Sequence, residues 1–172
     1  TMREHNAQAA IGNLAIATEL LLKAFIAKQN LTLLYKDLPT ELRCALLSPD
    51  RMPEGFRLQP YILDLKASVY KSLQLDEAIS IFYIFFPDIK QRLSPHLRYL
   101  ARHRNICVHA VHPDCREYEV QRAAFLLLSL VKHIESVDAE LLRYSNWGNK
   151  EKNDAFLAEF NEERLNSVHR KI

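Results

Sequence analysis

A short segment of the chain concentrates side chains that could act on phosphate groups. Residues 90–116 contain six lysines or arginines and one aspartate, a local charge of +5, while the remaining residues of the 172-residue chain sum to −3. On a helix with about 100° per residue, one stripe holds Arg98, Arg102, Asn105 and His109 at spacings of four, three and four. Two cations, an amide and an imidazole on one stripe are typical of a site that grips phosphate.

Arg104 points in a different direction on the same helix. It falls between Ala101 and Val108 on the apolar face, where a guanidinium must be paired. Two explanations are open: a core ion pair with a carboxylate such as Glu19, or a cleft or subunit interface where the charge meets substrate. In an unbroken helix Arg104 and His109 lie about 140° apart, so joint action requires a distorted terminus, a long reach by the arginine or a second subunit.

The segment RNICVH, Arg104 to His109, resembles the R-x(4–6)-H motif of HEPN domains. The surroundings are similar too, with a first helix reading AIATELLLKAFIAK, the motif near the end of a later helix, and a long amphipathic helix after it. Asn105 matches the family's preference for a polar residue after the arginine. Val108 stands where some toxin members have tyrosine, and Arg102 offers a competing R-x6-H. The resemblance covers about residues 5 to 145.

HEPN domains are all-α bundles, and many are metal-independent ribonucleases that dimerise so that two motifs share a cleft. The resemblance implies that Arg104 and His109 are the catalytic pair, with Asn105 orienting substrate or histidine and Glu19 supporting the site. A ribose 2′-OH would attack the adjacent phosphate, His109 would move the proton, and Arg104 would hold the developing charge. The side chains expected to track the RNA backbone are Arg98, Arg102, His103, His112 and Arg116.

The resemblance also implies partners. We expect RNA as substrate, a homodimer, and an inhibitory protein of antitoxin type, in a toxin, phage-defence or stress role, with no cofactor and no metal. Cys44, Cys107 and Cys115 are odd in number and show no CxxC pairing, which favours a reducing compartment. The longest apolar stretch, Ala78 to Pro87, is shorter than the roughly 20 residues that span a bilayer, and no signal-like segment precedes Ile11. We therefore expect a cytoplasmic protein without membrane contact.

Other interpretations of the same segment stay open. It offers five potential metal ligands within thirteen residues, although in no zinc spacing that we recognise: His103, Cys107, His109, His112 and Cys115. It could also serve a non-catalytic helical module that binds nucleotide, RNA or a partner protein. Finally, it could be a solvated basic face with no ligand. Cleavage of RNA in EDTA, and the salt dependence of binding, distinguish these functions.

The sequence predicts helices for the segments that must position these residues. Three glycines in the whole chain and an apolar content of 48% favour long helices. We expect an all-α, HEPN-like bundle of about five main helices in residues 1–148, with residues 149–172 forming an accessory C-terminal helix packed on the same domain. Periodicity places helices at about residues 5–29, 39–47, 61–73, 76–86, 94–109 and 114–147, with a loop at 48–60.

Two local signals refine this expectation. Ser94 followed by Pro95 predicts the start of the motif helix, because serine can cap and the missing N–H of proline is harmless in a first turn. Gly12, inside the first helix, is expected to allow close approach of a neighbouring element. The aromatic helix at 76–86 is expected at the centre of the core or at a subunit interface.

Overall fold

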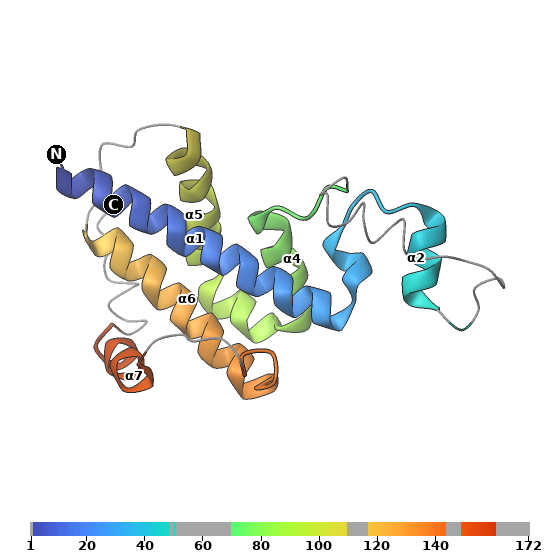
Figure 1. The fold of residues 1–172 in the computed structure, drawn as a ribbon. Helices are drawn as coiled ribbons and strands as arrows, with labels where there is room; N and C mark the ends of the chain where they lie inside the picture. Colours follow the sequence, from blue (N-terminus) through green and yellow to red (C-terminus); the bar gives the residue numbers. More distant parts are fainter. Residues whose placement is uncertain (1, 49, 51–69, 110–116, 144–148, 161–172) are drawn as a thin grey trace.

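The chain is helical throughout the part that the computed structural model describes, which is residues 2–48, 50, 70–109, 117–143 and 149–160, with backbone alone for 2–5 and 106–109. Its elements (Figure 1) are α1 (Met2–Gln29), the 3₁₀ helix η1 (Leu31–Leu34), α2 (Thr40–Leu47), α4 (Leu75–Phe85), α5 (Pro87–His109), α6 (Glu117–Val137) and α7 (Lys150–Glu159). No strand occurs in these ranges, so the prediction of an all-α helical bundle is confirmed.

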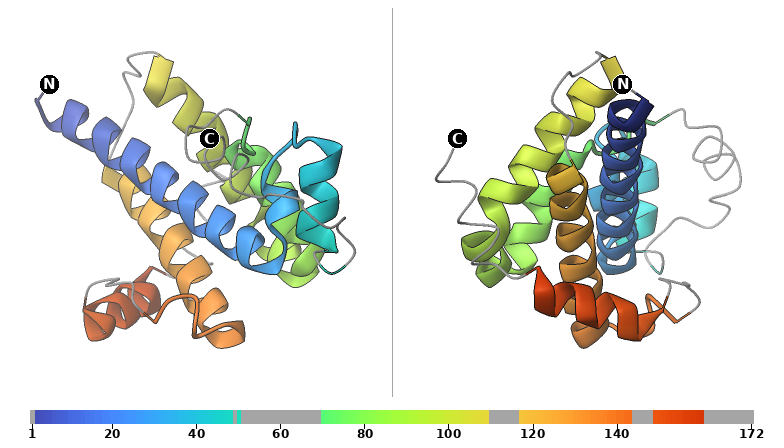
Figure 2. Two further views of the ribbon diagram at one scale, coloured as in Figure 1. Left: turned by 45° about the vertical axis from the view of Figure 1, so that its right-hand side comes forward. Right: turned by 90° about the vertical axis from the view of Figure 1, so that its left-hand side faces the viewer.

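Helix α1 is the centre of the bundle. It packs against α4, α5 and α6, and Figure 2 shows α6 alongside it while α7 crosses the far end of α6. The core forms where the apolar stripes of these four helices meet, as their 3.6-residue periodicity requires. Its fully buried members include Ala15, Leu22, Ile26, Ala78, Phe82, Leu97, Leu126, Leu130 and Ile134.

Part of α1 also meets the length and composition of a membrane-spanning helix. Among the described residues this is true of one segment, Asn6–Gln29. The core helix of a folded domain meets the same criteria, and here Ala15, Leu22 and Ile26 are fully covered by the neighbouring helices. On its outer face Ile16 and Leu20 are exposed.

Gly12 lies in open space. A Cβ atom added at this position would meet no atom within 4 Å, so the expected close approach of a neighbour is wrong. Glycine inside a helix costs about 0.5–1 kcal/mol relative to alanine because it loses more backbone freedom on folding. We therefore expect Gly12→Ala to raise the free energy of unfolding by up to about 1 kcal/mol, measured by urea denaturation. A less stable variant would show that the position is constrained after all.

The motif helix begins earlier than predicted. Helix α5 starts at Pro87, where a proline is harmless, and it continues through Pro95, so the predicted start at Ser94 is wrong. A proline inside a helix costs about 3 kcal/mol. That cost is offset because the preceding turns bury Ile89 and Leu93, and full burial of each such side chain contributes about 1.5–3 kcal/mol.

Helix α6 ends earlier than predicted, at Val137 rather than near residue 147. The reason is Asp138, whose side chain accepts hydrogen bonds from the Lys28 ammonium at 2.7 Å and from the backbone N–H of Leu141 at 3.2 Å. The second contact forms a turn that competes with the helix. These contacts hold the pKa of the Asp138 carboxyl below its usual value, with the hydrogen bond from Lys28 as the main cause.

A narrow neck joins the chain before α2 to the chain before α4. Tyr35 and Ser72 form an isolated antiparallel bridge, and the flanking N–H groups of Lys36 and Leu73 donate across it at 3.1 and 2.9 Å. Residues 70–73 are therefore not helical, which corrects the end of the helix predicted at 61–73. Residues 61–69 and most of the predicted loop at 48–60 lie outside the described residues. The buried side chains near and on α2, namely Leu38, Leu42 and Ala45, are not part of the main core.

The C-terminal helix packs on α6. Phe160, which follows α7, lies against Phe125 of α6 with ring centroids 5.6 Å apart and ring planes inclined at 52°. Lys132 of α6 pairs with Asp154 at 3.0 Å. Asn149 caps α7 by accepting from the N–H of Lys152 at 3.1 Å. The predicted accessory helix is thus present over Lys150–Glu159, while residues 161–172 lie outside the description.

His133 on α6 should make the stability of the fold depend on pH. Its ring packs edge-on against Phe86 at 4.5 Å, and burial lowers the pKa of its imidazole, with Asp88 raising it and Arg92 lowering it to smaller extents. The unfolded chain therefore takes up this proton at a higher pH than the folded chain. Stability should fall as the pH drops below the unfolded value near 6.5. The free energy of unfolding, measured with urea at about pH 7.5 and about pH 5.5, should change less between these pH values for His133→Gln than for the unchanged protein. An equal change in the two proteins would contradict this assignment.

Candidate functional site

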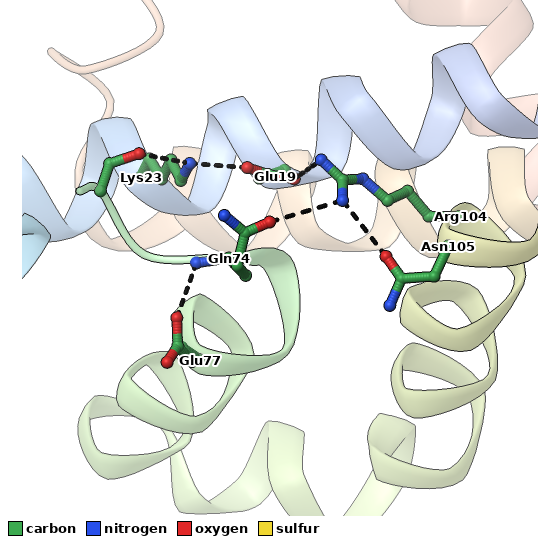
Figure 3. Close-up of polar contacts among 7 residues, drawn as sticks. Glu19, Lys23, Gln74, Glu77, Arg104 and Asn105 are labelled. Carbon is green, nitrogen blue, oxygen red and sulfur yellow. Dashed lines mark hydrogen bonds and ion pairs between the residues drawn. The ribbon is translucent and has the colours of Figure 1, made fainter. Parts of the chain in front are cut away.

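Arg104 is held by an ion pair to the central helix. Its Nη2 lies 3.2 Å from Oε2 of Glu19 on α1, and the two side chains are 24% and 10% exposed (Figure 3). The ion pair with Glu19, one of the two explanations for a guanidinium on the apolar face, is therefore present. Arg104 nevertheless keeps a quarter of its surface in contact with solvent, so the pair is not sealed inside the core.

The remaining contacts fix both partners of this ion pair. The other carboxylate oxygen of Glu19 accepts from the Lys23 ammonium at 2.6 Å, and Lys23 also donates to the Ser72 hydroxyl at 3.2 Å. The second terminal nitrogen of Arg104 donates to Oδ1 of Asn105 at 3.2 Å and to Oε1 of Gln74 at 3.5 Å. Helices α1 and α5 and the residue before α4 thus position one guanidinium, whose buried Nε finds no hydrogen-bond partner among the residues that the structure describes.

Gln74, the residue before α4, is fixed in place by a hydrogen bond to Glu77. Its backbone N–H donates to Oε2 of Glu77 at 2.8 Å, and Glu77 also pairs with Lys36 at the neck. Both contacts lower the pKa of the Glu77 carboxyl, with the backbone hydrogen bond from Gln74 as the larger cause. The first turn of α4 is therefore anchored beside Arg104, and Glu77 is ionised with its charge already compensated.

A groove of about 590 Å³ runs between α4 and the second half of α5. Three residues of the predicted phosphate-gripping stripe, Arg98, Arg102 and Asn105, line the same wall, so the helical spacing brought them together as expected. Both arginines are exposed, and neither forms an ion pair within the described residues. Two uncompensated cations one turn apart repel one another by a few tenths of a kcal/mol, a cost that an anionic ligand would remove. The opposite wall is formed by Asp76, Glu77, Ile79, Ser80 and Ile81.

The other predicted site residues divide into two groups. His103 is 9% exposed and packs against Tyr99 with ring centroids 4.0 Å apart and ring planes inclined at 38°, so its expected place on an RNA-tracking surface is wrong. The side chain of His109, the last residue of α5, lies outside the described residues, as do His112 and Arg116. No group of three metal-ligating side chains occurs in the described part, but the ligand set considered from the sequence falls mostly outside it.

A second polar cluster, between α5 and α6, was missed from the sequence. Arg122 is 3% exposed, lies 2.8 Å from Nδ1 of His96, sits 4.0 Å above the ring of Tyr99, and has a distant carboxylate, Glu119, at 3.9 Å. Helical spacing could have revealed it, because residue 122 precedes the buried residues 126 and 130 by four and eight positions and therefore lies on the same buried face of α6. Arginine at such a position must be paired inside the fold.

Comparison with known proteins adds no relative: no family model, no curated protein and no solved structure matches this chain.

Proposed function

We propose that the protein is a metal-independent endoribonuclease of HEPN type, in which Arg104 and His109 act on one phosphate of RNA. The observation that carries the proposal is the second half of α5, which presents two uncompensated arginines to a groove and, beside them, a third arginine held in place by Glu19 and Asn105. Such pre-positioned cations stabilise the charge that develops on phosphoryl oxygens.

The proposed reaction uses the substrate's own nucleophile. The ribose 2′-oxygen attacks the adjacent phosphorus, the bond to the 5′-oxygen of the next nucleotide breaks, and the products carry a cyclic phosphate and a free 5′-hydroxyl. His109 removes the proton from the 2′-OH or delivers one to the leaving oxygen. Arg104 neutralises the phosphoryl oxygens, Asn105 orients the substrate or histidine, and Glu19 acts only through Arg104 as a positioning residue.

The same proposal extends to partners. RNA is the substrate, a second copy of the chain completes the cleft, and an inhibitory protein restrains an activity that would otherwise damage cellular RNA. In this proposal the protein acts in the cytoplasm.

A second function is favoured by a specific observation. Arg104 already has Glu19, Asn105 and Gln74 as partners, and it is not among the residues that line the groove. Because the donors of Arg104 are occupied by other protein groups, this arginine suits a non-catalytic module. Such a module would bind nucleotide, RNA or a partner protein through Arg98 and Arg102 alone.

One assay separates the two functions. Purified protein is incubated in EDTA with a mixed-sequence RNA labelled at one end, and the fragment ends are identified by mass spectrometry. The nuclease function predicts fragments with cyclic phosphate termini that disappear in His109→Ala, while Arg43→Ala, an exposed arginine on α2, cleaves normally. Salt-sensitive binding without cleavage would support the module, and neither binding nor cleavage would exclude both.

A further inference from the structure

The groove contains one carboxylate whose charge is not compensated. Asp76 lines the α4 wall, is exposed, and forms no ion pair within the described residues. Its neighbour Glu77 is different, because that carboxylate is occupied by Lys36 and by the Gln74 N–H. Asp76 therefore lines the groove as a hydrogen-bond acceptor for which the described part of the chain supplies no partner.

The two walls require different chemistry from a ligand. Arg98 and Arg102 attract an anion, while Asp76 repels a second anion and attracts a hydrogen-bond donor. Ile81 contributes partly exposed apolar surface to the groove, against which a flat or ring-shaped group can lie. A free phosphate would use one wall only, and a second phosphate placed at Asp76 would meet repulsion. The ligand must therefore place an anionic group on the α5 wall and a hydrogen-bond donor on the α4 wall.

A ribonucleotide has these properties. Its phosphate suits the paired arginines, its ribose hydroxyls are donors to a carboxylate, and a volume of about 590 Å³ lies within the range of small-molecule sites. A carboxylate that accepts hydrogen bonds from ribose hydroxyls is a recurrent solution in nucleotide-binding proteins. The 2′-hydroxyl is also the group by which a protein distinguishes RNA from DNA.

We infer that the groove between α4 and α5 holds one ribonucleotide unit, with its phosphate on Arg98 and Arg102 and its 2′-hydroxyl donating to Asp76. Asp76 is then a specificity-determining residue, because it favours ribose over deoxyribose at this position. The inference depends on the proposed binding of RNA by this groove, but it does not depend on cleavage.

Mononucleotides test this inference, since they can bind without being cleaved. Binding of adenosine 5′-monophosphate, its 2′-deoxy analogue and inorganic phosphate is measured by calorimetry in EDTA. The unchanged protein should bind the ribonucleotide about tenfold more tightly than the deoxy analogue, the effect of one hydrogen bond to a charged group. Asp76→Ala should lose this ratio by weakening the ribonucleotide alone, and Asp76→Asn should reduce it partly.

Matched variants separate specificity from folding. Arg98→Gln and Arg102→Gln should weaken the ribonucleotide and the deoxy analogue alike, and Asp37→Asn, an exposed aspartate outside the groove, should change neither. Equal binding of the two nucleotides by the unchanged protein, or a ratio unaffected by Asp76→Ala in a variant with normal circular dichroism, would overturn the inference. So would binding of a peptide in place of nucleotides.

The cleavage assay keeps the two proposals distinct. A protein that cleaves RNA normally after Asp76→Ala, with no ribose preference, would retain the nuclease function and lose this inference. A protein that shows the Asp76-dependent preference without cleaving RNA would retain the inference and favour the non-catalytic module.

Discussion

Replacement of Arg104 by alanine is expected to lower the rate of RNA cleavage by at least about a hundredfold, the usual effect of removing one donor that stabilises transition-state charge. Arg104→Lys should not restore the rate, because an ammonium lacks the planar fork that contacts Glu19 through one nitrogen and Asn105 and Gln74 through the other. Binding of RNA should change much less, since Arg98 and Arg102 remain.

The structure also predicts that this variant folds. Without Arg104, Glu19 keeps the Lys23 ammonium at 2.6 Å, so no charge is left buried and alone. The guanidinium is only partly buried, which limits the expected loss of stability to about 1–2 kcal/mol. Single-turnover cleavage in EDTA, with Arg43→Ala as the control, measures the effect. Cleavage by Arg104→Ala at the normal rate would remove Arg104 from the catalytic machinery.

Glu19 provides a graded version of the same test. Glu19→Gln retains the shape of the side chain but removes the charge that holds Arg104. The cleavage rate constant should fall while the RNA concentration for half-saturation stays nearly constant, because the change affects orientation and not the groove. A merely structural ion pair would lower stability without this kinetic separation.

Arg122→Ala is expected to cause the largest loss of stability, about 3–5 kcal/mol, because it removes one partner of a buried charged cluster. The change leaves the Glu119 carboxylate, whose side chain is 13% exposed, without its cation, and it leaves a cavity over Tyr99. Domains of this size unfold at a cost of roughly 5–15 kcal/mol, so the variant loses a large fraction of its stability.

The comparison with an apolar replacement identifies the cause. Arg122→Met leaves Glu119 without its cation, as alanine does, but it retains most of the side-chain volume and so avoids the cavity over Tyr99. Urea denaturation of both variants should therefore give a clearly smaller loss for methionine than for alanine, and Arg43→Ala should stay within about 0.5 kcal/mol of the unchanged protein. Equal losses for the two replacements would show that the charge of Arg122 is essential to the fold.

The helices that could be predicted from the sequence are those whose apolar periodicity decides their ends. The predictions at 5–29, 39–47 and 76–86 differ from α1, α2 and α4 by at most three residues at either end. Errors arose where a local end signal was preferred to burial. Ser94 and Pro95 looked like a helix start, but the apolar face continues upstream through Ile89 and Leu93. The helix predicted at 114–147 was too long, because Asp138 ends α6 through a contact with distant Lys28.

Of the candidate site, the sequence predicted mainly the residues that lie together on one helix, α5. Spacing along α5 placed Arg98, Arg102 and Asn105 together, and the need to pair Arg104 pointed to Glu19. The opposite wall could not be predicted, because Asp76 reaches the groove through the packing of α4 on α5, which no local pattern encodes. Gln74 had a signal that was overlooked: a polar residue before an apolar helix with a glutamate three positions later resembles a capping box.

The neck formed by Tyr35 and Ser72 should let α2 unfold locally at a lower free energy than α1 and α6. Because the chain enters and leaves residues 36–71 at the same point, α2 can open and close without separating α1 from α4. Its amide hydrogens should exchange with solvent through a local event of low free energy, while those of α1 and α6 wait for global unfolding.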